Sequence, residues 1–190
     1  MAQAPLTLRR WRRVEYARLV ELGVFDREPI ELIGGQLVVA EPQGPYHAAA
    51  ITRVDYAPRA VVPPGWIVRL QAPVSLDEES EPEPDVAVVP GRPGDYRDSH
   101  PTRPVLLVEV AESSLELDRS GKGSLYARAD LADYWIVNLS EGVVEVYRDS
   151  QPDASAAFGH SYRSVSRLAP PATVVPLAFS GQLAVADLLP

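Results

Sequence analysis

The segment PVLLVEV, residues 104–110, constrains the fold of this chain more than any other stretch. All of its residues except Glu109 are apolar, which is typical of a central strand whose two faces are both covered. Side chains alternate along a strand, so Glu109 faces the side opposite to Val108 and Val110. A carboxylate in such a strand is costly unless it is paired or bound to a metal, so we expect Glu109 to point into a cleft.

The rest of the chain reads as short elements separated by prolines and glycines. We expect Pro58 to stop the second helix and Asp118 to cap the third. From about Ser150 the sequence predicts only a weak strand over 173–179 and a short apolar end over 184–189. The other predicted elements are helices over 7–22, 45–57 and 118–129, strands over 66–76 and 85–89, a hairpin over 28–40 around Gly34-Gly35, and a hairpin with its turn at 140–142.

This order of elements predicts a mixed α/β (α+β) fold, in which one mixed central sheet is flanked by helices and carries additional β-hairpins. A length of 190 residues suits a single domain. We expect its core at about 24–148, with the tail, 149–190, packing on the core or extending it. The acidic run at 77–83 is expected to be a solvated loop, and the pair Tyr134-Trp135 is expected to lie in the core.

Composition excludes several classes of function. The formal net charge of −8 argues against non-specific coating of nucleic acid. The absence of cysteine excludes disulfides, thiol nucleophiles and cysteine zinc sites, and it suits the reducing cytoplasm. The three histidines lack the spacing of a zinc site. The sequence has no apolar run long enough for a membrane span and no signal peptide, so we expect a cytoplasmic protein without a membrane partner.

A second carboxylate stands beside another predicted strand. Asp85 follows Pro84 and precedes the apolar run 86–89, so it lies at the open end of that strand. Neighbouring strands lie about 5 Å apart, and two carboxylates that close repel each other unless a cation separates them. Magnesium or manganese suits such an oxygen-rich site, with Asp85 and Glu109 as ligands. Lys122, on the helix expected after Glu109, can reach the same cleft and orient water or offset phosphate charge.

Each of these residues also has a simpler interpretation, and the residues alone leave it open. Asp85 can belong to an ordinary turn that precedes a strand. Glu109 can pair with an arginine such as Arg69. Lys122 can be a solvated residue on the surface of a helix.

Taken together, the motifs resemble the Uma-two family of putative restriction endonucleases, within the PD-(D/E)XK nuclease superfamily. The resemblance implies a restriction-endonuclease-like core with Asp85, Glu109 and Lys122 in the active site. The usual lysine of the superfamily lies two residues after the acid, where this chain has Ala111, so Lys122 stands for a lysine that has moved to the following helix. The segments that carry the resemblance are ELIGGQL at 31–37, PYH at 45–47, APVSLDEESEPEPDVAVV at 72–89, LLVEVAESS at 106–114, DRSGKGSLYARADLADYWIVNL at 118–139 and VVEVYR at 143–148.

The same resemblance extends to two further residues and to a function. An early glutamate, matched by Glu31, is typical of the superfamily site, and His47 matches a histidine near the start of the second helix. The resemblance implies a nuclease that hydrolyses phosphodiester bonds of DNA with magnesium or manganese. The alternatives are a catalytically silent nuclease-like module for binding or assembly, and a scaffold unconnected with nucleic acid. We also expect a homodimer, whose candidate basic face is formed by Arg9, Arg10, Arg12 and Arg13.

Overall fold

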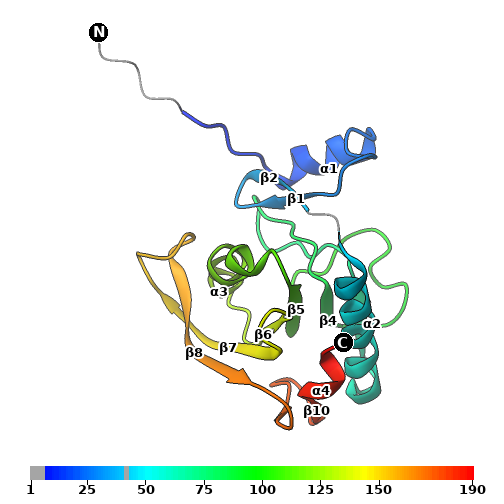
Figure 1. Ribbon diagram of the computed structural model, residues 1–190. Coiled ribbons are helices and arrows are strands. Elements are labelled where there is room, and N and C mark those ends of the chain that lie inside the picture. Colours follow the sequence, from blue (N-terminus) through cyan, green and yellow to red (C-terminus); the bar gives the residue numbers. More distant parts are fainter. Residues whose placement is uncertain (1–6, 41–42) are drawn as a thin grey trace.

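The computed structural model describes residues 7–40 and 43–190 and has a six-stranded mixed sheet at its centre (Figure 1). The strand order is β3-β4-β5-β6-β7-β8. All neighbours are antiparallel except β5 and β6, which are parallel and are joined by a helical crossover. The strands are β3 (Trp66–Leu70), β4 (Val86–Pro90), β5 (Leu106–Ala111), β6 (Tyr134–Asn138), β7 (Val143–Pro152) and β8 (His160–Leu168).

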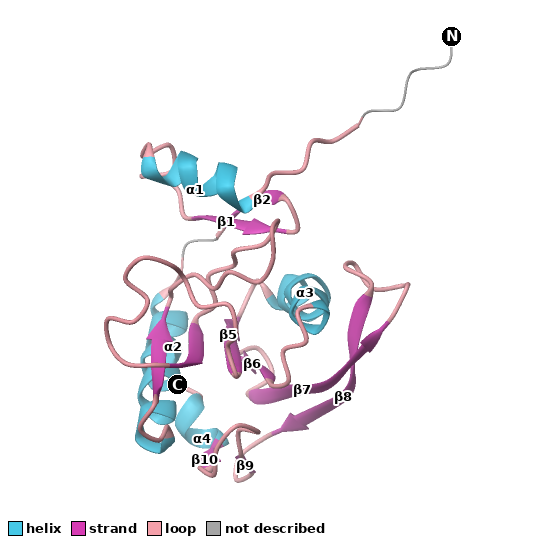
Figure 2. Cartoon of the chain, turned by 180° about the vertical axis from the view of Figure 1, so that it is seen from behind, coloured by secondary structure: helices cyan, strands magenta, loops and turns pink. Residues whose placement is uncertain are grey.

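Helices cover both faces of this sheet (Figure 2). On one face, α2 (Pro45–Val61) and α4 (Val185–Leu188) pack with Val108 and Val110 into one apolar cluster. On the other face, α3 (Gly123–Arg128) packs with Leu107 into a second cluster. The two clusters confirm the predicted alternation along β5, and every residue of that strand is buried. Tyr134 and Trp135 are fully buried, as predicted, and they lie in different clusters.

A small layer lies beside one end of the sheet and consists of α1 (Arg13–Glu21), β1 (Ile30–Ile33) and β2 (Gln36–Val39) (Figure 1). The acidic run 77–83 docks on this layer, so the prediction of a solvated loop holds for the exposed Glu78 and Glu83 and was wrong for the buried Glu81. Backbone N–H groups fix it in place: Glu81 donates to the Leu32 carbonyl at 2.7 Å, and Gly35 donates to the Glu79 carbonyl at 2.7 Å. The Ser75 hydroxyl also donates to the buried Glu81 carboxylate at 2.6 Å.

The same contacts change the interpretation of the N-terminal arginines. Each of the four predicted for a basic face pairs with an acid of its own chain, three of them in the acidic run or its flank. Their charge is therefore offset locally, and they form no free basic face. The pairs are Arg9–Glu15, Arg10–Glu79, Arg12–Glu78 and Arg13–Glu81.

Two predicted helix limits were wrong. The first helix begins at Arg13 rather than at residue 7, because the Trp11 N–H bonds the Gly35 carbonyl at 2.8 Å and holds the preceding chain extended. The second helix continues through Pro58 to Val61. Pro58 lies in the last turn, where its missing N–H removes only one helical bond, and the apolar face of α2 packs on the sheet.

Two further boundaries differ from the prediction. The strand predicted over 66–76 ends at Leu70, because Gln71 has a positive φ of 41°. Asp118 does not cap a helix. It is buried within a helical segment that starts at residue 115 and includes a π-helix, η1 (Leu117–Lys122), before α3.

The tail contributes more to the sheet than predicted. β7 extends to Pro152, and β8 pairs with it along its length. Val144 lies opposite Leu168 at one end, and Pro152 lies opposite His160 at the other. β8 was missed because its nine residues, HSYRSVSRL, are mostly polar and only Tyr162 is buried. Instead of one strand over 173–179, the structure has the short pair β9 (Thr173–Val174) and β10 (Leu183–Ala184). Among the described residues, no helix is long and apolar enough to cross a bilayer.

Candidate active site

A pocket of about 650 Å³ opens where the small layer meets the end of the central sheet. Its walls come from the β1–β2 hairpin, the first turn of α2, the start of β4, the end of β5 and η1. The structure places all four predicted site residues, and also His47, in the lining of this pocket. The four predicted residues are Glu31, Asp85, Glu109 and Lys122, and each is buried.

The pairing of β4 and β5 brings the two predicted metal ligands together. Val86 pairs with Val108, so the antiparallel register places Asp85 opposite Glu109 one residue further on. Directly opposite side chains in a sheet lie on the same face, with Cβ atoms about 5 Å apart. The Val110 N–H donates to Asp85 Oδ2 at 2.7 Å and fixes that carboxylate at the strand end.

Glu109 contacts residues of the helical crossover above it. The buried Tyr126 hydroxyl donates to Glu109 Oε1 at 2.7 Å, and Lys122 Nζ lies 3.2 Å from the same oxygen. Arg69 is not its partner, since that guanidinium donates to the Pro73 carbonyl at 2.8 Å. The interpretation of Glu109 as half of an arginine pair was therefore wrong.

Lys122 lies inside the pocket rather than in solvent. Its side chain is 7% exposed, and its Nζ donates to Glu31 Oε1 at 3.3 Å. Glu31 in turn accepts the Glu83 N–H at 2.9 Å, so the hairpin strand β1 and the segment before β4 are joined beneath the lysine. Lys122 is also the only lysine among the 18 basic residues of the chain, a signal that a count of residue types reveals.

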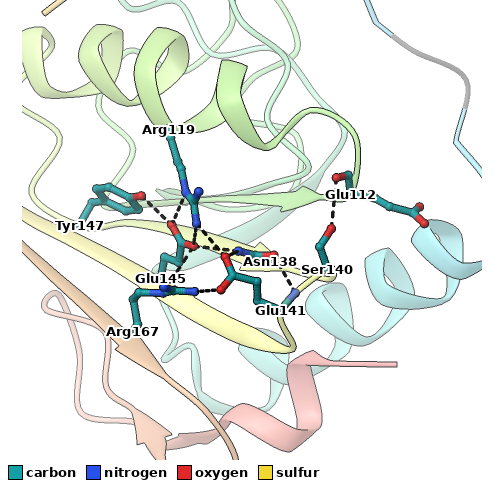
Figure 3. A network of polar contacts seen from close by, with 8 residues as sticks. All are labelled: Glu112, Arg119, Asn138, Ser140, Glu141, Glu145, Tyr147 and Arg167. Carbon is teal, nitrogen blue, oxygen red and sulfur yellow. Dashed lines mark hydrogen bonds and ion pairs between the residues drawn. The ribbon is translucent and has the colours of Figure 1, made fainter.

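The π-helical turn η1 directs Lys122 into the pocket. Its main chain is held by the Tyr134 hydroxyl, which donates to the Asp118 carbonyl at 3.0 Å. On the other side, Arg119 Nε donates to Glu145 Oε2 at 3.0 Å and ties the turn to β7 (Figure 3). A side chain at Gly123 would be tight, because its Cβ would lie 3.2 Å from the Asp118 carbonyl oxygen. π-Helical turns of this kind are frequent at functional sites.

Burial and mutual repulsion shift the pKa values of the acids in the pocket. Burial raises the pKa of Glu109 well above its usual value, and it also raises the pKa of Asp85, with Lys122 acting against both shifts. Asp118 has its pKa raised to about 6, again chiefly by burial. For Lys122, burial alone would lower the pKa, but Glu109 and then Glu31 outweigh it, so the pKa is raised and the ammonium is retained.

This charge balance fits a divalent cation. The pocket gathers several carboxylates around one ammonium, and such an excess is relieved by a proton or by a cation. Within the described part of the chain, no three carboxylate or histidine side chains are arranged to coordinate one ion together. Two carboxylates, with water completing the shell, are a donor set that magnesium or manganese accepts.

Some residues of the pocket were not predicted for the site. Asp118 was expected to cap a helix, and Gln71 fell within the strand predicted over 66–76. Tyr126 contacts Glu109 without lining the pocket, and it carried no prediction of its own. Glu83 also lines the pocket, and burial raises its pKa. His47 Nε2 lies 3.9 Å from Asp85 Oδ2 and has no hydrogen-bond partner among the described residues.

Comparisons with known proteins bear on the family and the fold. The model of the Uma2 family, described as "Putative restriction endonuclease", matches residues 14–186. A crystal structure described as a putative nuclease belonging to DUF820, from Anabaena variabilis ATCC 29413, superimposes with a TM-score of 0.62. The two chains are 20% identical over 84% of this chain and 88% of the other, so this likeness concerns the fold. No curated protein matches the chain.

Proposed function

Because the chain belongs to the Uma2 family of putative restriction endonucleases, we propose that it is a nuclease that hydrolyses phosphodiester bonds of DNA with magnesium or manganese. A nuclease family implies a nucleic-acid substrate, and the choice of DNA and of the metal is our proposal. Assembly as a homodimer and a location in the cytoplasm stay predictions.

We assign Asp85 and Glu109 as the residues that hold the metal ion. Asp85 is oriented by the Val110 N–H, and Glu109 is oriented by the Tyr126 hydroxyl. A metal ion held by these two carboxylates would supply an activated water molecule and positive charge near the scissile phosphate.

Lys122 supplies a fixed positive charge next to the reacting phosphate. Glu31 and Glu109 hold its ammonium from two sides, so the charge is in place before substrate arrives. A preorganised charge of this kind stabilises the charge that develops on the phosphate without reorganising during the reaction. Glu31 acts on the reaction through Lys122.

One observation carries this proposal: the only lysine of the chain is buried among the carboxylates of this pocket. Burying a lysine is costly even where its charge is paired. A silent binding module would gain nothing from that cost, so the arrangement supports the enzyme over the silent module. It also argues against a scaffold unconnected with nucleic acid.

Two substitutions separate metal binding from chemistry. Asp85→Asn removes a charge that holds a hard cation, so we expect weaker binding of manganese in calorimetry. Lys122→Ala should leave manganese affinity intact or raise it, yet lower the rate of plasmid cleavage by on the order of a hundredfold. Lys122→Arg keeps the positive charge, but its larger, planar guanidinium group should not restore full activity in the confined site.

The control is Asp55→Asn, which removes a carboxylate from an ion pair with Arg59 on the outer side of α2. This variant should bind manganese and cleave as the wild type does. Wild-type protein that binds manganese but cleaves neither DNA nor RNA would contradict the enzyme and favour the silent module.

A further inference from the structure

Gln71 has a backbone conformation that its residue type does not favour. Its φ is +41°, in the left-handed region. The other non-glycine residues described with positive φ are Asp130 and Asp149. Aspartate tolerates this region because its short side chain bonds nearby backbone, whereas glutamine has no such advantage. A strained residue of this kind calls for a reason, and strain is often found at functional sites.

The strained residue lies directly against Asp85. Gln71 follows the end of β3, and its backbone N–H donates to the Asp85 carbonyl at 2.9 Å. Its side chain turns the same way, because Nε2 donates to Asp85 Oδ1 at 3.5 Å. Gln71 is thus connected to Asp85 through both main chain and side chain, and it lines the same pocket.

The two oxygens of Asp85 are held by different partners. Oδ2 accepts the Val110 N–H at 2.7 Å. In the described part of the chain, Gln71 is the hydrogen-bond donor to Oδ1. One contact leaves a carboxylate free to rotate about its Cβ–Cγ bond, whereas two contacts fix its plane. Residues that fix a metal ligand in this way commonly change metal affinity when they are replaced.

We propose that Gln71 is a positioning residue for Asp85, whose carboxamide fixes the plane of the carboxylate and keeps Oδ1 turned toward the pocket. This rests on the proposed function, in which Asp85 holds the metal. The alternative is that residue 71 serves only the turn after β3. Glycine would serve such a turn better, since it adopts positive φ without strain. Glutamine retains the strain because its amide acts on Asp85.

The test is Gln71→Gly, which relieves the backbone strain and removes the amide together. We expect the melting temperature of the metal-free protein to rise by about 2 °C, while manganese affinity in calorimetry falls by about tenfold. Asp149→Gly is the matched control, because Asp149 has a φ of 60° at an exposed position of β7, away from the pocket. It should also gain stability, but its manganese affinity should equal that of the wild type.

A second variant, Gln71→Met, keeps the length of the side chain and the backbone strain but lacks the amide. It should lose manganese affinity as Gln71→Gly does, without gaining stability. Unchanged affinity in both variants would overturn the proposal, and so would an equal loss in Asp149→Gly.

The proposal can fail separately from the proposed function. If the wild type binds no manganese, the function is wrong, and Gln71 is then tested by thermal unfolding of the metal-free protein. The effect of Gln71→Met is compared in the wild type and in Asp85→Asn. Non-additive changes support the contact, and additive changes overturn it.

Discussion

Two groups of buried carboxylates lie on the same side of the sheet, and their surroundings differ. In the first, Glu145 on β7 is surrounded by donors: Arg119, Asn138 and Tyr147 all bond its carboxylate, and Arg167 lies beside it (Figure 3). In the second, the carboxylates of the pocket share Lys122. We call the first group satisfied because its donors outweigh the effect of burial, and the second unsatisfied because its donors do not.

The pKa values follow this difference. Burial acts to raise the pKa of Glu145, but hydrogen bonds from Arg119, Tyr147 and Asn138 outweigh it and lower the pKa to about 2. At Glu109 the effect of burial dominates, and the pKa is raised. A buried acid with a full set of donors stabilises its folded surroundings. A buried acid whose pKa stays raised despite its donors is a candidate for a functional site.

The largest effect is expected when the satisfied group is broken. Glu145→Ala leaves two arginines, an amide and a phenol without their shared acceptor, so we expect a loss of about 3 kcal/mol in the free energy of unfolding. Chemical denaturation measures it. As a control, Glu21→Ala removes an exposed partner of Arg18, and its change should stay within about 0.5 kcal/mol. A loss for Glu145→Ala no larger than the control would contradict the comparison.

A smaller effect is expected when the unsatisfied group loses a carboxylate. Glu109→Gln should fold as stably as the wild type without metal, because the amide avoids the cost of a buried charge. Manganese at ten times its dissociation constant should stabilise the wild type by about 1.4 kcal/mol and the variant by much less. Thermal shift with and without manganese shows this. If the metal-free variant were destabilised as much as Glu145→Ala, the pocket would be an ordinary structural network.

The smallest effect concerns pH, and its sign differs between the groups. The pKa of Glu145 falls from 4.5 to about 2, so its contribution to stability is complete above pH 4.5 and is lost as pH falls toward 2. The pKa of Asp118 rises from 3.8 to about 6, so its contribution is complete below pH 3.8 and is lost as pH rises through 6.

The melting temperatures of two amide variants, measured as a function of pH, test these opposite pH dependences. Relative to the wild type, Glu145→Gln should lose most stability above pH 4.5, and this difference should shrink toward pH 2. Asp118→Asn should gain stability between pH 4 and 7. Slopes of equal sign would show that the two groups do not differ in their proton balance.

The sequence located the pocket because its acids interrupt apolar strands. Glu109 is a charged residue within an apolar run, and Asp85 lies at the start of another predicted strand. Pairing of these two strands was enough to predict that the two carboxylates lie close together. The strand order and the helical crossover gave Lys122 its place. Glu31 was expected in the site only through the resemblance to a known family, because nothing in the hairpin sequence distinguishes it.

Other features depend on contacts between distant segments. β8 has a polar sequence and becomes a strand because β7 offers it a partner. The acidic run 77–83 is buried in part because α1 and the β1–β2 hairpin cover it. The strain at Gln71 comes from its position against Asp85, 14 residues away in the chain. Neither hydrophobic period nor residue propensity reports such contacts.

The π-helical turn η1 has a consequence for the length of the chain. An α-helical turn advances by about 100° per residue, and a π-helical turn accommodates extra residues at the same helical rise. Deleting one residue from 119–121 would let the segment rewind as a regular α-helix. Because the π-helical turn absorbs its extra residue within one widened turn, α3 would keep its direction and Tyr126 would still face Glu109. At this place the chain can lose one residue without changing the alignment of α3 with β5.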